Sequence, residues 1–221
     1  MFFKDNRNVY RAGGLASFSW LEHGFGTRDS ADWPDPWRLV MLKQIHSDQI
    51  VRIEGGRGYL GEGDALVTDR PGVLIGIRTA DCVPILIADP DNHAVAAVHA
   101  GWRGTLDRIA TKAVERLAAE YGSKPENLHA AIGPAIGPCC YEVGPEVSER
   151  FRILVPDLPV EGKAHLDLID LNRRMLIVGG LDPGKIYSTG LHCTKCGPAE
   201  LHSFRRDGPK SGRMIAAIGV L

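Results

Sequence analysis

Three residues of types that bind zinc, His46, Cys82 and His99, each lie in or beside a stretch that we expect to form a buried strand. Imidazole and thiolate groups suit zinc, and three protein ligands leave a fourth position for water or substrate, as in catalytic zinc sites. We therefore expect a metal site with an open position, and so an enzyme. The three residues are too far apart in the chain for a local zinc finger, so the fold would have to assemble the site.

The same three residues are compatible with different roles. His46 and His99 could equally be hydrogen-bonded core histidines, with Cys82 as a small buried hydrophobic residue. A cysteine hydrolase acting on a peptide or cell-wall precursor would use Cys82 as nucleophile and His99 as base. A metal-binding or partner-binding module without turnover is the non-enzyme alternative.

The loop after His99 contains Gly101, Trp102, Arg103 and Gly104. It brings free backbone N–H groups, a cation and the start of an expected helix together, and such a helix end attracts phosphate or carboxylate. The alternative is a plain strand-to-helix turn with Arg103 in solvent. Arg103 is thus a candidate ligand for an anionic group of the substrate.

Buried strands and an amphipathic helix have to position these residues. The helix is expected from about residue 105 to 121, where apolar residues recur at spacings of three and four, with Thr105 as N-cap and Gly122 as its end. Pro84 indicates a strand edge, a bulge or a strand start. We expect further helices over residues 141–151 and 170–179, one or two strands over 38–53, and strands over 64–68, 73–77, 83–88, 93–99, 128–132, 185–188 and 213–221.

The order of these elements indicates the fold class. Strands and helices interleave without a strict βαβ rhythm, which favours a layered α/β or α+β sandwich over a doubly wound sheet. A chain of 221 residues with 44% hydrophobic residues can bury one substantial core, and no segment has the composition of a linker. We therefore expect a single domain over residues 1–221.

Composition restricts the partners and the compartment. Lys and Arg total 26 against 27 for Asp and Glu, so no global field favours nucleic acid or an anionic membrane. No apolar run approaches the roughly 20 residues of a spanning helix. Five cysteines without a secretory signal indicate reduced thiols in the cytoplasm. We expect a cytoplasmic protein with a small-molecule partner.

Four cysteines lie outside the candidate site. His192 and Cys193, followed by Cys196 and with His202 nearby, resemble half of a structural zinc site, but there is no second C-x-x-C, so we expect packing thiols. The adjacent pair at 139 and 140 is expected to be buried and reduced. A basic group around an Asp-Gly turn is expected to be a solvated hairpin tip, with a second anion site as the alternative; it consists of Arg205, Arg206, Lys210 and Arg213.

Several long motifs occur in one order along the chain: KQIHSDQ, GDALVTD, RTADCVPILIAD, AVHAGWRGT, IGPAIGPCCYEVG, and SFRRDG followed by GRM. Together they resemble the YfiH-like family, the laccase-domain or polyphenol oxidase group now described as purine nucleoside phosphorylases. The likeness extends from His23 to the C-terminus. It implies an αββα sandwich with mixed sheets and a zinc ion held by His46, Cys82 and His99, which would also be the catalytic residues.

The resemblance also implies an activity. The expected substrates are adenosine, inosine and S-methyl-5'-thioadenosine with phosphate, and adenosine deamination is expected as a side activity. For the substrate contacts we expect Arg28 and Arg103 to share the phosphate charge, Gln44 to bond the purine or ribose, and Asp81 to be the general acid. We expect a monomer or weak homodimer that binds neither nucleic acid nor membrane.

Copper is the alternative metal, and with it a polyphenol oxidase activity. A true multicopper laccase needs about ten histidines, many of them in His-x-His pairs, to hold four coppers. This chain has eight histidines and no such pair. The count therefore disfavours a multicopper laccase.

Overall fold

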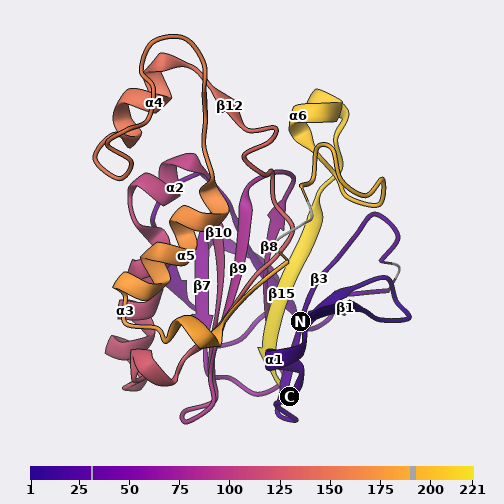
Figure 1. The fold of residues 1–221 in the computed structure, drawn as a ribbon. Coiled ribbons are helices and arrows are strands. Elements are labelled where there is room, and N and C mark those ends of the chain that lie inside the picture. The colour runs from indigo at the N-terminus through magenta and orange to yellow at the C-terminus, as the bar shows by residue number, and fades with distance from the viewer. Residues whose placement is uncertain (31, 190–192) are drawn as a thin grey trace.

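The structure is a computed structural model that describes residues 1–30, 32–189 and 193–221 (Figure 1). Two large β-sheets face each other. Helices α2 (Trp102–Leu106), α3 (Ile109–Tyr121) and α5 (Leu168–Val178) cover the outer face of the second sheet. The expected layered sandwich of mixed α/β type is confirmed.

The first sheet has seven strands in the order β1-β2-β3-β15-β8-β4-β6. Strand β4 runs parallel to both β8 and β6, and the other neighbours are antiparallel. The strands are β1 (Phe2–Lys4), β2 (Tyr10–Ala12), β3 (Leu21–Phe25), β4 (Leu39–Lys43), β6 (Gly58–Glu62), β8 (Leu74–Thr79) and β15 (Met214–Val220).

The second sheet has six strands in the order β14-β11-β9-β10-β7-β5, with parallel pairs at its two edges. Its strands are β5 (Ile50–Arg52), β7 (Ala65–Thr68), β9 (Val83–Asp89), β10 (Ala94–Ala100), β11 (His129–Ile132) and β14 (Ile186–Ser188). A two-stranded antiparallel sheet consists of β12 (Glu142–Val143) and β13 (Ala164–His165). The remaining described elements are the short helices α1 (Gly13–Ala16), α4 (Pro145–Phe151) and α6 (Phe204–Asp207) and the 3-10 helices η1 (Pro125–Asn127), η2 (Pro183–Lys185) and η3 (Gly208–Lys210).

The central strands of the second sheet are apolar on both faces, because one face meets the first sheet and the other meets the helices. In β9, Leu86 and Ala88 pack into the core between the sheets, whereas Ile85 and Ile87 pack against the helical layer. All seven residues of β9 are buried. A strand covered on both sides has a continuous apolar sequence in place of alternation, as seen here.

Three connections cross from the first sheet to the second. Residues 44–49 join β4 to β5, residues 63–64 join β6 to β7, and residues 80–82 join β8 to β9. The stretch over 38–53, for which we expected one or two strands, thus contains two strands that belong to different sheets. The crossing segments contain His46, Asp64 and Cys82, so the topology brings polar residues to the rim of the sandwich.

The expected helix over 105–121 is two helices. Arg108 has a left-handed backbone with φ of 58°, which separates α2 from α3. Thr105 is not the N-cap; it lies inside α2, and its hydroxyl accepts a hydrogen bond of 2.9 Å from the Asn172 amide. Gly122 ends α3 with φ of 71°, as expected, because glycine adopts this conformation without a Cβ clash.

Two prolines set element boundaries. The helix expected over 141–151 begins only at Pro145, because the residue before a proline is disfavoured in the helical region, and Glu142–Val143 is a strand. Pro84 is the second residue of β9, which confirms the strand-start interpretation over an edge position.

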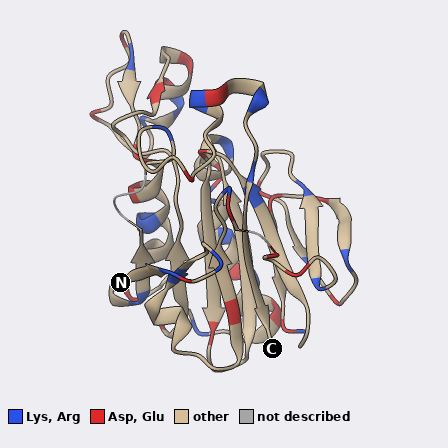
Figure 2. Ribbon diagram, turned by 90° about the vertical axis from the view of Figure 1, so that its right-hand side faces the viewer, with Lys and Arg blue, Asp and Glu red and all other residues tan. Residues whose placement is uncertain are grey.

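The surface mixes both signs of charge. Figure 2 shows basic and acidic positions interspersed along the ribbon, in keeping with the formal net charge of -1. Among the helices in the described ranges, none has the length and apolar character to cross a membrane.

Candidate active site

His46 projects from the first crossing segment, which wraps around a buried carboxylate. The backbone N–H groups of Ile45, His46 and Ser47 donate to Asp64 at 3.2, 3.0 and 2.6 Å. His46 itself has φ of 58°. The turn is therefore held in an uncommon backbone conformation by hydrogen bonds to one side chain, which fixes where the imidazole points.

Asp64 is fully buried and also contacts the second histidine. Its Oδ1 lies 2.8 Å from Nδ1 of His99. Burial raises the pKa of the Asp64 carboxyl, but hydrogen bonds from His99 and Ser47 outweigh it and lower the pKa to about 2. Asp64 was not among the residues predicted from the sequence, although a signal exists: it is an acidic residue directly before an apolar strand, within the GDALVTD motif.

His99 lies near the end of β10 and is 3% exposed. Burial lowers the pKa of its imidazole, but the Cys82 thiol group and Asp64 raise it to about 9. Because Nδ1 faces Asp64, Nε2 is the nitrogen left to face a ligand. A carboxylate on the far side of a histidine is the usual way in which proteins orient a metal-binding imidazole.

Cys82 brings the third ligand atom to the same place. One ligand atom each from His46, Cys82 and His99 lies within 4.8 Å of the others. A Cβ atom at Gly101 would lie 3.0 Å from Nδ1 of His46 and 3.2 Å from Sγ of Cys82. Two imidazoles, a thiolate and an orienting carboxylate fit zinc, and they also fit copper.

This cluster opens into a cavity of about 1040 Å³. Besides the three ligand-type residues, its lining contains Arg78, Arg205 and Arg213 and the aromatic residues Tyr59, Trp102, Tyr141 and Phe204. With the residues that the structure describes, none of these arginines forms an ion pair with a carboxylate; their guanidinium groups donate to a tyrosine hydroxyl and to backbone carbonyls. The cavity thus combines a metal-type cluster, aromatic surface and cationic groups free to meet an anion.

Tyr141 lines the same cavity as Cys82. Burial, followed by the nearby Cys82, raises the pKa of its hydroxyl to about 12. It therefore stays protonated at neutral pH and can donate a hydrogen bond into the cavity. The Arg205 guanidinium lies 5.1 Å from the centre of the Tyr141 ring.

A family profile described as multi-copper polyphenol oxidoreductase laccase matches residues 28–221. The chain belongs to this family. The family resemblance deduced from the motifs is thereby confirmed.

Relatives of this laccase-like chain have names from nucleoside chemistry. A purine nucleoside phosphorylase of Deinococcus radiodurans is 43% identical over 185 residues, which is 82% of this chain and 70% of that protein. Adenosine deaminase RL5, from an unknown prokaryotic organism, is 39% identical over 196 residues, covering 81% of this chain and 74% of its own length. The crystal structure of the hypothetical protein YfiH of Bacillus licheniformis has a TM-score of 0.89 at 30% identity and covers 100% of this chain and 99% of that one.

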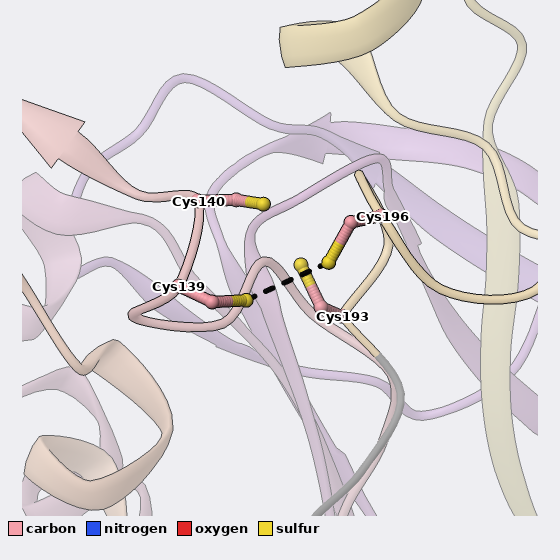
Figure 3. Close-up of side chains that lie close together, drawn as sticks. All are labelled: Cys139, Cys140, Cys193 and Cys196. Atoms are coloured by element: carbon pink, nitrogen blue, oxygen red, sulfur yellow. Dashed lines mark hydrogen bonds between the residues drawn. The ribbon is translucent and has the colours of Figure 1, made fainter.

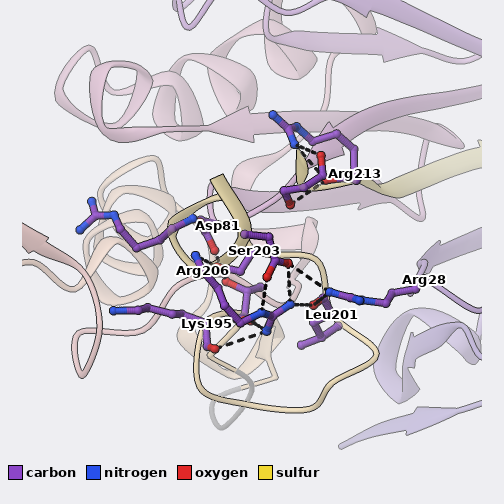
Figure 4. Close-up of polar contacts among 12 residues, drawn as sticks. Arg28, Asp81, Lys195, Leu201, Ser203, Arg206 and Arg213 are labelled. Atoms are coloured by element: carbon purple, nitrogen blue, oxygen red, sulfur yellow. Dashed lines mark hydrogen bonds and ion pairs between the residues drawn. The ribbon is translucent and has the colours of Figure 1, made fainter. Parts of the chain in front are cut away.

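The substrate contacts expected from the sequence take varied places in this member of the laccase-like family. Asp81 lines the cavity, and its two carboxylate oxygens accept hydrogen bonds of 2.6 Å from the Thr194 hydroxyl and from the backbone N–H of Arg205 (Figure 4). Gln44 also lines it, but its amide exchanges hydrogen bonds of 2.9 and 2.7 Å with the backbone of Arg78. Both side chains hold the walls of the cavity in place.

The two arginines expected to share the phosphate charge do not line the cavity. The Arg28 guanidinium pairs with Asp207 at 3.2 Å and donates to the Leu201 carbonyl at 3.3 Å (Figure 4). The Arg103 guanidinium lies 4.9 Å from the centre of the Trp102 ring. Burial lowers the pKa of His46, and the charges of His99 and, to a smaller extent, Arg103 lower it further. Their part in substrate binding stays a prediction.

The basic group near the C-terminus is not a hairpin tip. Phe204–Asp207 is a short helix, α6, whose Ser203 side chain accepts from the backbone N–H of Arg206. Two members of the group, Arg205 and Arg213, line the cavity. The expectation of a hairpin tip was therefore wrong, and these two exposed side chains lie at the wall of the cavity.

The cysteines outside the ligand cluster come together (Figure 3). Cys139 is exposed and Cys140 is partly exposed, so the expectation that this pair is buried was wrong. The sulfur atoms of Cys139, Cys140, Cys193 and Cys196 all lie within 4.8 Å of one another. His192 of the predicted half-site lies outside the described residues, and His202 is not a member of this group.

Proposed function

We propose that this protein is a zinc-dependent purine nucleoside phosphorylase, acting on adenosine, inosine and S-methyl-5'-thioadenosine with phosphate, and that the same site deaminates adenosine. The observation that carries the proposal is the meeting of the His46, Cys82 and His99 cluster with three arginines that lack carboxylate partners among the described residues, in one aromatic-lined cavity. The names of the relatives support nucleoside chemistry at such a site.

Each part of the cavity suits one need of phosphorolysis, in which phosphate attacks the sugar carbon and the purine departs. Arg78, Arg205 and Arg213 hold the phosphate, because guanidinium groups match the oxygens of phosphate. Trp102 and Tyr141 offer ring faces to the purine. The protonated Tyr141 hydroxyl donates to an oxygen or nitrogen of the substrate.

His46, Cys82 and His99 would hold the zinc ion, and Asp64 orients the ring of His99. Bound there, zinc would supply Lewis-acid stabilisation of negative charge and, for deamination, activation of water. Asp81 has both oxygens engaged by protein donors, so in this proposal it positions the site and the general acid lies elsewhere.

The test is to incubate metal-analysed protein with adenosine, with and without phosphate, and to separate adenine from inosine. We expect adenine only when phosphate is present, and inosine in both conditions. In Cys82→Ala both products should fall by at least about 100-fold, because one of three ligands is lost. Equal product in that variant would refute the assigned site.

A cysteine hydrolase remains the second candidate, for a specific reason. Asp64, His99 and Cys82 follow one another in contact, as orienting acid, base and nucleophile would. In that case activity on a peptide panel would survive chelators and end when Cys82 is alkylated. Oxygen uptake with phenols would favour the copper oxidase named in the family description, and no product from any panel would favour a binding module.

A further inference from the structure

The four cysteines outside the active-site cavity form a second convergent cluster. They come from two loops that are distant in the sequence: Cys139 and Cys140 follow β11, and Cys193 and Cys196 follow β14. Figure 3 shows the four side chains pointing toward a common centre. The adjacent pair thus supplies the two thiols that the C-x-x-C segment lacks in the sequence.

The spacing of the sulfurs fits a single metal ion. A tetrahedral zinc with Zn–S bonds of about 2.3 Å places its four sulfurs about 3.8 Å apart. Here Sγ of Cys139 lies 3.6 Å from Sγ of Cys196, and all four sulfurs lie within 4.8 Å of one another. A tetrahedral set of four thiolates is diagnostic of zinc or iron–sulfur chemistry, and this compact arrangement suits one ion.

The turn between Cys193 and Cys196 is built to hold a thiolate. Backbone N–H groups of Gly137, Lys195 and Cys196 donate to the Cys193 sulfur, and such donors stabilise negative charge on sulfur. The turn closes with a hydrogen bond of 2.7 Å from the Gly197 N–H to the Cys193 carbonyl. A Cβ atom at Gly197 would lie 2.3 Å from that carbonyl oxygen, so only glycine fits there.

We propose that Cys139, Cys140, Cys193 and Cys196 bind a second zinc ion with a structural role, distinct from the metal of the active-site cavity. Four protein ligands close the coordination sphere, which is the arrangement of structural zinc sites. The ion joins the 137–141 loop to the 193–197 turn.

This joint lies directly behind the cavity wall. Tyr141, which follows Cys140, lines the cavity, and Thr194, inside the turn, donates to Asp81 beside Cys82. The Arg206 guanidinium donates to the Thr194 carbonyl at 3.0 Å, which ties α6 to the same turn. The second ion therefore fixes the side of the cavity that contains Tyr141 and Asp81.

The test isolates this cluster from the active-site cluster. The full chain is produced without a polyhistidine tag as His46→Ala/Cys82→Ala, which removes two ligands of the cavity site, and its metal content is measured by mass spectrometry. We expect about one equivalent of zinc to remain per chain. Adding Cys196→Ser should remove that equivalent, whereas Lys195→Ser, a change in the same turn without a thiol, should leave it in place.

X-ray absorption provides a second measurement that leaves all four cysteines intact. In the His46→Ala/Cys82→Ala chain, the zinc edge should show four sulfur neighbours at about 2.3 Å. The proposal is overturned by a metal-free chain, by iron in place of zinc, by nitrogen or oxygen neighbours, or by zinc retained after Cys196→Ser. An intact mass lower by the hydrogens of a disulfide would also overturn it, in favour of a redox pair.

Discussion

Gly101 shows how one residue without a side chain makes room for the ligand cluster. Its φ of -74° and ψ of 177° are open to any residue, so backbone conformation does not explain a glycine here. The reason is space, because a Cβ would lie 3.0 Å from the ring of His46 and 3.2 Å from the sulfur of Cys82. A substitution at Gly101 therefore perturbs the cluster by steric contact while leaving His46, Cys82 and His99 unchanged in sequence.

We expect Gly101→Ala to reduce zinc occupancy of the cavity site and to lower phosphorolysis by at least about 10-fold, since a displaced ligand loses its coordination geometry. The measurements are metal content and adenine production. Gly184→Ala is the control, because Gly184 lies outside the cavity lining and its Cβ would approach no atom closer than 3.3 Å. Normal zinc content and normal turnover in Gly101→Ala would refute the steric argument, because the added Cβ would then displace no ligand.

Single residues also mark the limit of sequence reasoning. Arg205 and Arg213 belong to a basic group whose local sequence indicates a solvated turn, yet they line the cavity. Arg28 has the same charge and forms a surface ion pair with Asp207. Charge type does not tell these arginines apart, because what differs is the direction in which distant segments present them.

At the scale of elements, the site depends on three segments that cross between the sheets. Asp64, in the second of these segments, joins the first segment to β10: its side chain accepts from the 45–47 backbone and contacts His99, and its carbonyl accepts the backbone N–H of His99 at 2.8 Å. One buried carboxylate therefore sets the positions of two candidate ligands that lie on different elements.

We expect Asp64→Asn to weaken zinc binding at the cavity site by about 10- to 100-fold, because an amide orients the His99 ring less well and stabilises bound metal less. Competition with a chromogenic chelator measures the affinity. Asp69→Asn is the matched control, because Asp69 is a partly exposed carboxylate at the other end of β7. This variant should bind zinc as tightly as the parent does. An affinity within twofold of the parent in Asp64→Asn would remove Asp64 from the site.

At the scale of the whole molecule, a buried histidine links stability to pH. His23 is 3% exposed in β3, and its Nε2 accepts from the backbone N–H of Ala12 at 3.0 Å. Burial, followed by the nearby Arg11, lowers its pKa to about 3. Between about pH 3 and 6.5 the unfolded chain therefore binds one more proton at this position than the folded chain.

Because the unfolded chain binds the extra proton, the free energy of unfolding rises with pH across this window and falls on acidification. We expect His23 to lower the free energy of unfolding by about 1.4 kcal/mol for each pH unit of acidification between about pH 6 and 4. His23→Gln keeps an acceptor for the Ala12 N–H. In this variant the free energy of unfolding should depend less steeply on pH, by the equivalent of about one bound proton. Urea unfolding with chelator present, at several pH values, measures the slope of both proteins. An unchanged slope in the variant would mean that His23 does not control acid stability.

His99 does not contribute to the pH dependence of unfolding between about pH 4 and 6. Its pKa is raised to about 9, so it is protonated in both the folded and the unfolded state below pH 6. Its contribution to stability is present below about pH 6.5 and is lost as the pH rises toward 9. The two histidines therefore act in different pH windows, and the variant difference isolates His23.

The sequence alone determined the features that local pattern specifies. The apolar runs that form β9 and β10, the stripe of α3 and its end at Gly122 could all be predicted, because burial and capping act over a few residues. The ligand types at 46, 82 and 99 and the order of the motifs were enough to indicate the family. Thr105 is not an N-cap because α2 already begins at Trp102. The break at the left-handed Arg108 was not predicted either, since a non-glycine residue with positive φ leaves little trace in a sequence.

Only the tertiary structure decided which segments meet. It placed β4 and β5 in different sheets and brought Asp64 into contact with the His99 ring and the His46 backbone. It also placed Arg205 and Arg213 at the wall of the cavity and joined Cys139 and Cys140 to the C-x-x-C turn. The physical reason is that periodicity reports whether a residue is buried, not what it is buried against. Those contacts come from the packing of two sheets whose partners are far apart in the chain.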